Sequence, residues 1–157
     1  MARDAVVALG NPLMGDEGVG PAILDLLRDD PRLPSSVDLI DTSGFILTAL
    51  HALKGRRKVV FVDCAFMGET PGALRRFLPS QARSEKSLPG LSLHEGDLLK
   101  MLETARSLDA TAEEVVIYGI EPARVGPRQG LSPELCGNLE KYAESVLDEF
   151  LKEEPKS

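Results

Sequence analysis

Four short apolar runs, rich in β-branched residues, constrain the fold of this chain more than any other feature. They cover residues 5–9, 37–40, 59–62 and 115–120. A strand that is buried on both faces reads as a continuous apolar run, and segments with apolar residues at helical spacing lie between these runs. The alternation predicts an α/β fold with three layers, α/β/α, in which helices cover both faces of a mostly parallel, twisted sheet of about five strands.

The segments between and after the runs predict helices over residues 19–27, 45–53, 98–105 and 135–150. Pro21 cannot sit deep inside a helix, so the first helix should begin around residues 18–20. Residues 72–78 are expected to add one more strand, antiparallel to its neighbour. Residues 79–91 are rich in Ser, Pro and mixed charges and predict an exposed loop, and residues 121–130 predict a second irregular stretch.

The 157 residues fit one domain with a single substantial core. We expect the α/β domain to span residues 1–151 and residues 152–157 to form a disordered tail. The net charge of −7 argues against a sequence-independent nucleic-acid interface. No apolar stretch approaches the roughly 20 residues of a membrane span, and the first strand begins too early for a signal peptide. Cys64 and Cys136 lack Cys-x-x-Cys spacing, which suits a reducing, cytoplasmic compartment.

The turn after the first strand carries acids where a phosphate-binding loop would carry none. The segment from Gly10 to Gly20 is rich in glycine, which lets the backbone turn sharply from strand to helix. Asp16 and Glu17 stand side by side in it. Carboxylates are favoured near the free N–H groups of a helix N-terminus, so these acids are expected to serve the helix in part. Glu17 is also placed to meet a cation at the carboxyl edge of the strand.

The other three strands also run into acids, at Asp41, Asp63 and Glu121. Ligand sites of open α/β sheets lie beyond the carboxyl ends of the strands, and neighbouring strands are about 4.8 Å apart. Two carboxylates about 5 Å apart repel by roughly 3 kcal/mol at an effective dielectric of 20, so such a site needs a cation, a proton or wider spacing. Each acid taken alone can cap a turn, as Asp41 would before Thr42-Ser43-Gly44.

His94 is the residue that would turn these acids into a metal site. Ser92 and Glu95 have the spacing of a capping box, which places His94 in the first helical turn, where the helix dipole keeps its imidazole neutral and able to bind metal. The alternative is a solvent-exposed residue of that turn; His51, the other histidine, is interpreted as a surface or packing residue. Two carboxylates, from Glu17 and Asp63, with one imidazole suit nickel, zinc, manganese or iron and leave positions open.

Together these residues resemble the hydrogenase maturation endopeptidase family over almost the whole chain. The resemblance rests on an ordered set of motifs: Gly10-Asn11 with Asp16-Glu17-Gly18-Val19-Gly20, Val62-Asp63, Ser92-Leu93-His94, Gly119-Ile120-Glu121-Pro122 and Leu131-Ser132-Pro133-Glu134. The ordered set is far more specific than any single motif.

The resemblance implies an endopeptidase, of metal-dependent aspartic or metallo type, that removes the C-terminal extension of a nickel-loaded nickel–iron hydrogenase large-subunit precursor. It implies that Glu17, Asp63 and His94 contact nickel brought by the precursor, for which other divalent cations are expected to substitute. The family's aspartate for cleavage-site recognition falls on Asp41. There the family commonly has Asp-Gly-Gly-Thr, whereas this chain has Asp41-Thr42-Ser43-Gly44. A monomer that meets the precursor transiently is expected.

Three other interpretations stay open. Leu9-Gly10-Asn11-Pro12 also opens peptidyl-tRNA hydrolases, but their next loop resembles Thr-Arg-His-Asn, and the acidic charge fits tRNA poorly. A dinucleotide-binding module needs Gly-x-Gly-x-x-Gly, and the glycines here come in the wrong order. The third is a binding protein that checks a hydrogenase precursor for nickel without cleaving it.

Overall fold

The computed structural model describes residues 2–43, 45–84, 92–93 and 97–151. Within these residues one sheet follows the path β2-β1-β3-β6-β4, and β5 pairs with β3 off this path. The strands are β1 (Asp4–Ala8), β2 (Val37–Asp41), β3 (Lys58–Phe66), β4 (Leu74–Phe77), β5 (Ser92–Leu93) and β6 (Glu114–Ile120). The pairs β1–β2, β1–β3 and β3–β6 are parallel, and β4 runs antiparallel to β6. The four predicted parallel strands and the added antiparallel strand are confirmed.

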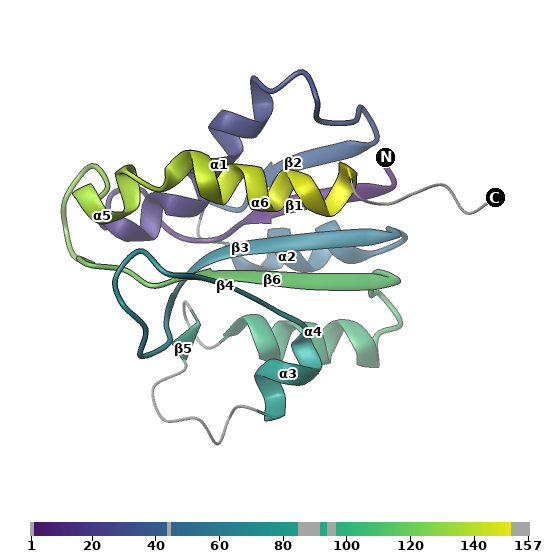
Figure 1. The fold of residues 1–157 in the computed structure, drawn as a ribbon. Coiled ribbons are helices and arrows are strands. Elements are labelled where there is room, and N and C mark those ends of the chain that lie inside the picture. Colours follow the sequence, from purple (N-terminus) through teal and green to yellow (C-terminus); the bar gives the residue numbers. More distant parts are fainter. Residues whose placement is uncertain (1, 44, 85–91, 94–96, 152–157) are drawn as a thin grey trace.

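Helices cover both faces of this sheet (Figure 1). They are the short 3-10 turn η1 (Asp16–Gly18), α1 (Val19–Arg28), α2 (Ile46–Leu53), α3 (Pro79–Ser84), α4 (Asp97–Ser107), α5 (Pro133–Cys136) and α6 (Leu139–Leu151). The helices α1 and α6 pack against each other on one face, and α2 and α4 pack on the other. The three-layer α/β/α architecture is therefore as predicted.

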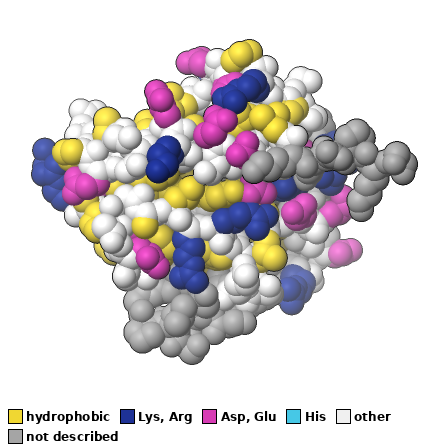
Figure 2. All heavy atoms as spheres, in the orientation of Figure 1, with side chains coloured by type: hydrophobic (Ala, Val, Ile, Leu, Met, Phe, Trp, Pro, Cys, Tyr) yellow, Lys and Arg dark blue, Asp and Glu magenta, His cyan; other side chains and the backbone are white. Residues whose placement is uncertain are grey.

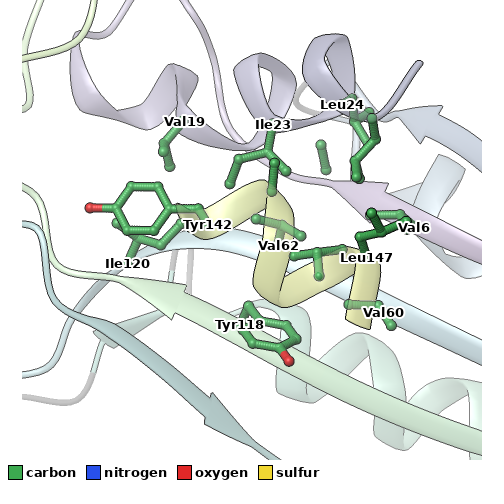
Figure 3. Close-up of a cluster of buried hydrophobic side chains, with 14 of the residues drawn as sticks. Val6, Val19, Ile23, Leu24, Val60, Val62, Tyr118, Ile120, Tyr142 and Leu147 are labelled. Atoms are coloured by element: carbon green, nitrogen blue, oxygen red, sulfur yellow. The ribbon is translucent and has the colours of Figure 1, made fainter. Parts of the chain in front are cut away.

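Each face of the sheet has its own apolar core, because side chains alternate along a strand. In β1, Val7 faces the core beneath α2 and α4, whereas Val6 faces the core beneath α1 and α6. Figure 3 shows the second core, where Ile23 of α1 and Leu147 of α6 point toward the sheet. Each fully buried aliphatic side chain of this kind contributes about 1.5–3 kcal/mol relative to exposure. No helix of the described residues is long and apolar enough to cross a membrane.

Three local predictions were wrong. Residues 79–84, expected in a loop, form the helix α3. Ser92 is not a helix N-cap: it pairs with Phe66 as part of β5, and α4 begins only at Asp97. Ladder hydrogen bonds to β3 thus override the local capping pattern. The long C-terminal helix is divided into α5 and α6. The predicted tail, residues 152–157, lies outside the described residues.

A charged cluster lies toward the amino ends of the strands, away from the acidic strand ends. Arg76 donates to the Glu149 carboxylate at 2.6 Å, and the Lys58 ammonium lies 3.1 Å from it. The Tyr118 hydroxyl also donates to this carboxylate. Burial alone would raise the pKa of Glu149, but these three hydrogen bonds lower it to about 2. The cluster therefore joins α6 to β3, β4 and β6 through a permanent negative charge at neutral pH.

Candidate active site

The turn after β1 brings Glu17 back to the strand that precedes it. Gly10 has a φ of +104°, a conformation that favours glycine, and a Cβ there would lie only 2.2 Å from the carbonyl oxygen of Glu17. The chain therefore doubles back so tightly that only glycine fits at this position. Glu17 is half-buried in η1, which contacts β3. This places the predicted Glu17 at the carboxyl edge of the sheet.

Asp63 reaches the same edge from the central strand. In the parallel register Ala8 pairs with Val62, so Asp63 extends one residue beyond the end of β1. The Asp63 side chain is fully buried, and Asp63 pairs with Gly119 of β6 on its other side. The structure therefore brings Glu17 and Asp63 to one edge from two separate elements, as the sequence predicted.

Cys64 follows Asp63 at this edge, and the acids of the edge act on its thiol. Burial raises the pKa of Cys64 far above its usual range, and the negative charges of Asp63, Asp16, Glu17 and Glu121 raise it further. A thiol held in its protonated form is a poor nucleophile, so Cys64 is a packing residue of the core beneath α1 and α6.

Asp16 has a role that the sequence interpretation missed. Its carboxylate is fully buried and accepts hydrogen bonds from the backbone N–H groups of Ala123, Arg124 and Ser132 at 2.8, 2.8 and 2.7 Å. It does not cap α1, whose N-cap Gly18 has no side-chain hydrogen bond. Asp16 instead fixes the irregular segment 121–132 against the glycine turn. The available signal was Ser132-Pro133, typical of a helix start, because Ser132 is the N-cap of α5.

Glu121, the acid after β6, is also occupied by the backbone. Its carboxylate oxygen Oε1 accepts hydrogen bonds from the N–H of Met67 at 2.7 Å and of Glu69 at 3.1 Å. This holds the connection between β3 and β4 over the end of β6. Of the acids at the strand ends, Glu121 therefore shapes the edge, and Glu17 and Asp63 are the candidates for chemistry.

Asp41 lies apart from these two acids. It pairs with Ala8, which pairs with Val62, so Asp41 and Asp63 have opposite orientations in the pleat and are separated by the width of β1. The Asp41 side chain is exposed and accepts a hydrogen bond from the Ser43 N–H at 2.8 Å, the turn that its sequence context suggested. Asp41 is thus available to a partner rather than to a centre formed by Glu17 and Asp63.

His94, the third member of the predicted triad, lies outside the described residues. Within the part of the chain that the structure describes, no group of three His, Cys, Asp or Glu side chains is arranged to hold a metal ion. The described edge therefore offers two carboxylates, Glu17 and Asp63, which are hard oxygen ligands suited to a divalent cation.

The family model for hydrogenase maturation proteases matches residues 21–149 of this chain. The chain belongs to that family. The hydrogenase expression/formation protein HupD of Rhodobacter capsulatus is 25% identical over 93% of this chain and 70% of its own length. The hydrogenase 2 maturation protease of Escherichia coli is 23% identical over 92% of this chain and 88% of its own length.

Solved structures agree with this family fold. The hydrogenase 2 maturation peptidase of Thaumarchaeota archaeon SCGC_AB-539-E09 is 30% identical to the chain, with a TM-score of 0.72 over 96% of this chain and 99% of the other. The E. coli hydrogenase-maturating endopeptidase HybD is 24% identical, with a TM-score of 0.78 over 96% of this chain and 93% of the other. The second likeness bears on the fold alone, and it extends over all the layers described above.

Proposed function

We propose that this chain is an endopeptidase that removes the C-terminal extension of a nickel-loaded nickel–iron hydrogenase large-subunit precursor. Membership of the maturation protease family supports a peptidase. The observation that carries the chemistry is the convergence of Glu17 and buried Asp63 at one edge of the sheet, at the end where open α/β sheets bind ligands.

In this proposal Glu17, Asp63 and His94 contact the nickel that the precursor carries. The described edge contributes no thiolate, since the Cys64 thiol stays protonated, so it should hold a free ion weakly. The affinity of this edge for the ion should rise when the precursor supplies the remaining ligands. Cleavage would then occur only after nickel has been inserted into the precursor. Hydrolysis adds water across the peptide C–N bond, giving a new carboxylate on the large subunit and a new amine on the released peptide. A divalent ion can assist by polarising the carbonyl group or activating the water.

Exposed apolar side chains around the acidic edge support a protein as substrate. We name this set the apolar rim: it consists of Leu13, Phe45, Leu47, Phe66 and Val125. All follow or end strands at their carboxyl ends, and Phe45 and Leu47 are 70% and 65% exposed. Exposed apolar groups on the segments that border a polar site are available for contact with a protein substrate. Exposed Asp41 ends β2, and Phe45 of the apolar rim follows in the next turn of the chain, which suits a role for Asp41 in recognising the precursor.

The test is incubation of the purified protein with nickel-loaded and metal-free precursor, followed by mass spectrometry of the products. We expect loss of the extension from the nickel-loaded form alone. Glu17→Gln, Asp63→Asn and His94→Ala should each lower the rate by at least about 100-fold, as expected for groups that act on the reacting centre. Full activity in all three variants would overturn the residue assignment.

The chain offers a matched control in its other histidine. His51 is exposed on α2, so His51→Ala should cleave at the wild-type rate. A wild-type protein that leaves the precursor intact but holds it in a nickel-dependent complex would instead be the non-cleaving checkpoint protein. That outcome would overturn the peptidase proposal while keeping nickel recognition.

A further inference from the structure

The loop that Asp16 fixes forms a cavity beside the acidic edge. We name residues 123–130 the arginine loop, because Arg124 and Arg128 lie in it. Its backbone is tied to the glycine turn: the Gly15 N–H donates to Arg128 O at 2.8 Å, and the Asp16 N–H donates to Arg124 O at 2.9 Å. Together with the bonds to the Asp16 carboxylate, these contacts give the loop a fixed conformation.

The cavity under this loop has a volume of about 220 Å³ and combines two chemistries. Arg124 and Arg128 supply positive charge, and Val125 and Pro127 supply apolar wall. Basic side chains lie at the left edge of Figure 2, next to an acidic one, where Figure 1 draws the loop that leads into α5. A volume of this size holds one amino-acid side chain.

Within the described residues, Arg124 and Arg128 differ from most arginines of the sheet and its helices in having no carboxylate partner. Arg32, Arg57 and Arg76 all form ion pairs at 2.6–2.8 Å. Neither Arg124 nor Arg128 forms an ion pair with any residue in the described ranges. Two arginines that line one cavity, and that have no carboxylate partner among the described residues, are suited to a carboxylate from outside, to which a guanidinium group can donate paired hydrogen bonds.

We propose that this cavity is a substrate subsite for an acidic side chain of the precursor near its cleaved bond. The inference rests on the proposed function and names what this end of the site recognises. Gly15 lines the cavity and Glu17 follows two residues later, so their Cα atoms are at most about 7 Å apart. An extended peptide covers that distance in two to three residues. The carboxylates of Glu17 and Asp63 would repel a polyanion, so a single carboxylate, with its stem against Val125 and Pro127, is the ligand that fits.

The experiment compares wild type, Arg124→Gln, Arg128→Gln and the double variant on nickel-loaded large-subunit precursor from the same organism. Arg106→Gln is the matched control, since Arg106 is exposed at the end of α4. Charge-assisted hydrogen bonds of this kind correspond to roughly 10–100-fold in affinity, so the double variant should raise KM by at least about tenfold. Its kcat should stay within about twofold, because the arginines do not touch the reacting atoms. Unchanged KM would overturn the proposal.

A double-mutant cycle with the substrate identifies the acidic residue. Each Asp or Glu within four residues of the cleaved bond is replaced by Asn or Gln, one at a time. One of these replacements should raise KM as much as the arginine changes do. Combining that replacement with the arginine changes should raise KM no further. If the free-energy effects of the two changes on KM simply add, the arginines do not contact that residue. Additivity at every acidic position would overturn the subsite.

A binding measurement separates failure of the subsite from failure of the peptidase. A fluorescein-labelled peptide that spans the cleavage site is titrated with wild type and the double variant, and anisotropy gives Kd without any cleavage. Tighter binding to wild type, by about tenfold, supports the subsite even if no precursor is cut. Equal Kd values with normal cleavage by wild type would overturn the subsite and leave the peptidase standing.

Discussion

Ser132 donates two hydrogen bonds to the buried carboxylate of Asp16, one from its backbone N–H at 2.7 Å and one from its hydroxyl at 2.9 Å. Burial alone would raise the pKa of Asp16, but these bonds and those from Ala123 and Arg124 outweigh it and lower the pKa. Asp16 is therefore an anion surrounded by donors. It joins the turn that carries Glu17 to a loop more than a hundred residues away along the chain.

Asp16→Asn should destabilise the protein although it removes few atoms. The new amide NH₂ would face N–H donors of Ala123, Arg124 and Ser132, and buried donors left unsatisfied cost about 1–3 kcal/mol. We expect the free energy of unfolding, measured with urea at pH 7, to fall by about 2–3 kcal/mol. Asp29→Asn is the control, because Asp29 is exposed and its neutralisation should change stability by less than about 0.5 kcal/mol. Equal free energies of unfolding for wild type and Asp16→Asn would contradict this role for Asp16.

Gly10→Ala should displace the backbone of Glu17 and lower activity. The added methyl group would lie 2.2 Å from the Glu17 carbonyl oxygen, and the φ of +104° is itself unfavourable for alanine. We expect a loss of about 2–3 kcal/mol of stability and at least a tenfold loss in precursor cleavage. Gly68→Ala is the matched control: its φ is +73°, but a Cβ there has nothing within 4 Å. If Gly68→Ala lost activity equally, backbone strain rather than contact with Glu17 would be responsible.

The sequence predicted the parallel strands and the position of two site residues, because both depend on patterns of residues that are close together in the chain. The apolar runs gave the parallel strands, because a strand between two helical layers must be apolar on both faces. The edge position of Glu17 and Asp63 followed from the rule that ligand sites lie beyond strand ends. The contacts of Asp16 could not be predicted this way, because its partners are distant in sequence and are mostly backbone N–H groups. The prediction of Ser92 as a helix N-cap was wrong for the same reason, since its pairing with distant Phe66 of β3 determines its conformation.

Leu47→Ser should weaken cleavage of the precursor without weakening the fold. Leu47 belongs to the apolar rim and is 65% exposed, so the folded monomer loses little from the change. Loss of one apolar contact to a protein substrate corresponds to roughly 1 kcal/mol, or about a fivefold higher KM. Leu108→Ser is a matched control, since Leu108 is 64% exposed but precedes β6, at the opposite edge of the sheet. Equal KM values for the two variants would exclude the rim from substrate contact.

Iodoacetamide should label Cys136 and spare Cys64. Cys136 is exposed, whereas Cys64 is buried in the core beneath α1 and α6. Mass spectrometry of the native protein should therefore show one adduct, and a second only after unfolding in urea. Cys64→Ala should retain precursor cleavage, because a buried, protonated thiol is not the nucleophile. Labelling of Cys64 in the native protein, or loss of cleavage in Cys64→Ala at unchanged stability, would contradict this interpretation.

Glu149 should make stability depend on pH below about 4.5. An unperturbed glutamate has a pKa of 4.5, and in the folded protein the pKa of Glu149 is lowered to about 2. The native state thus holds the charged form, so the stabilisation is fully present above pH 4.5 and is lost as pH falls toward 2. Glu149→Gln would leave buried Lys58 without its nearest carboxylate and should cost about 2–3 kcal/mol at pH 7.

The difference between wild type and Glu149→Gln should narrow as pH falls from 4.5 toward 2, because the wild-type carboxylate then becomes protonated. Urea titrations across this range measure the difference directly. Glu140→Gln is the control, since Glu140 is exposed in the first turn of α6 and should change stability by about 0.5 kcal/mol or less. The cluster lies toward the amino ends of the strands, so the rate of precursor cleavage at pH 7 should be unchanged. A constant difference across the pH range would show that Glu149 stabilises α6 by packing and not by its charge.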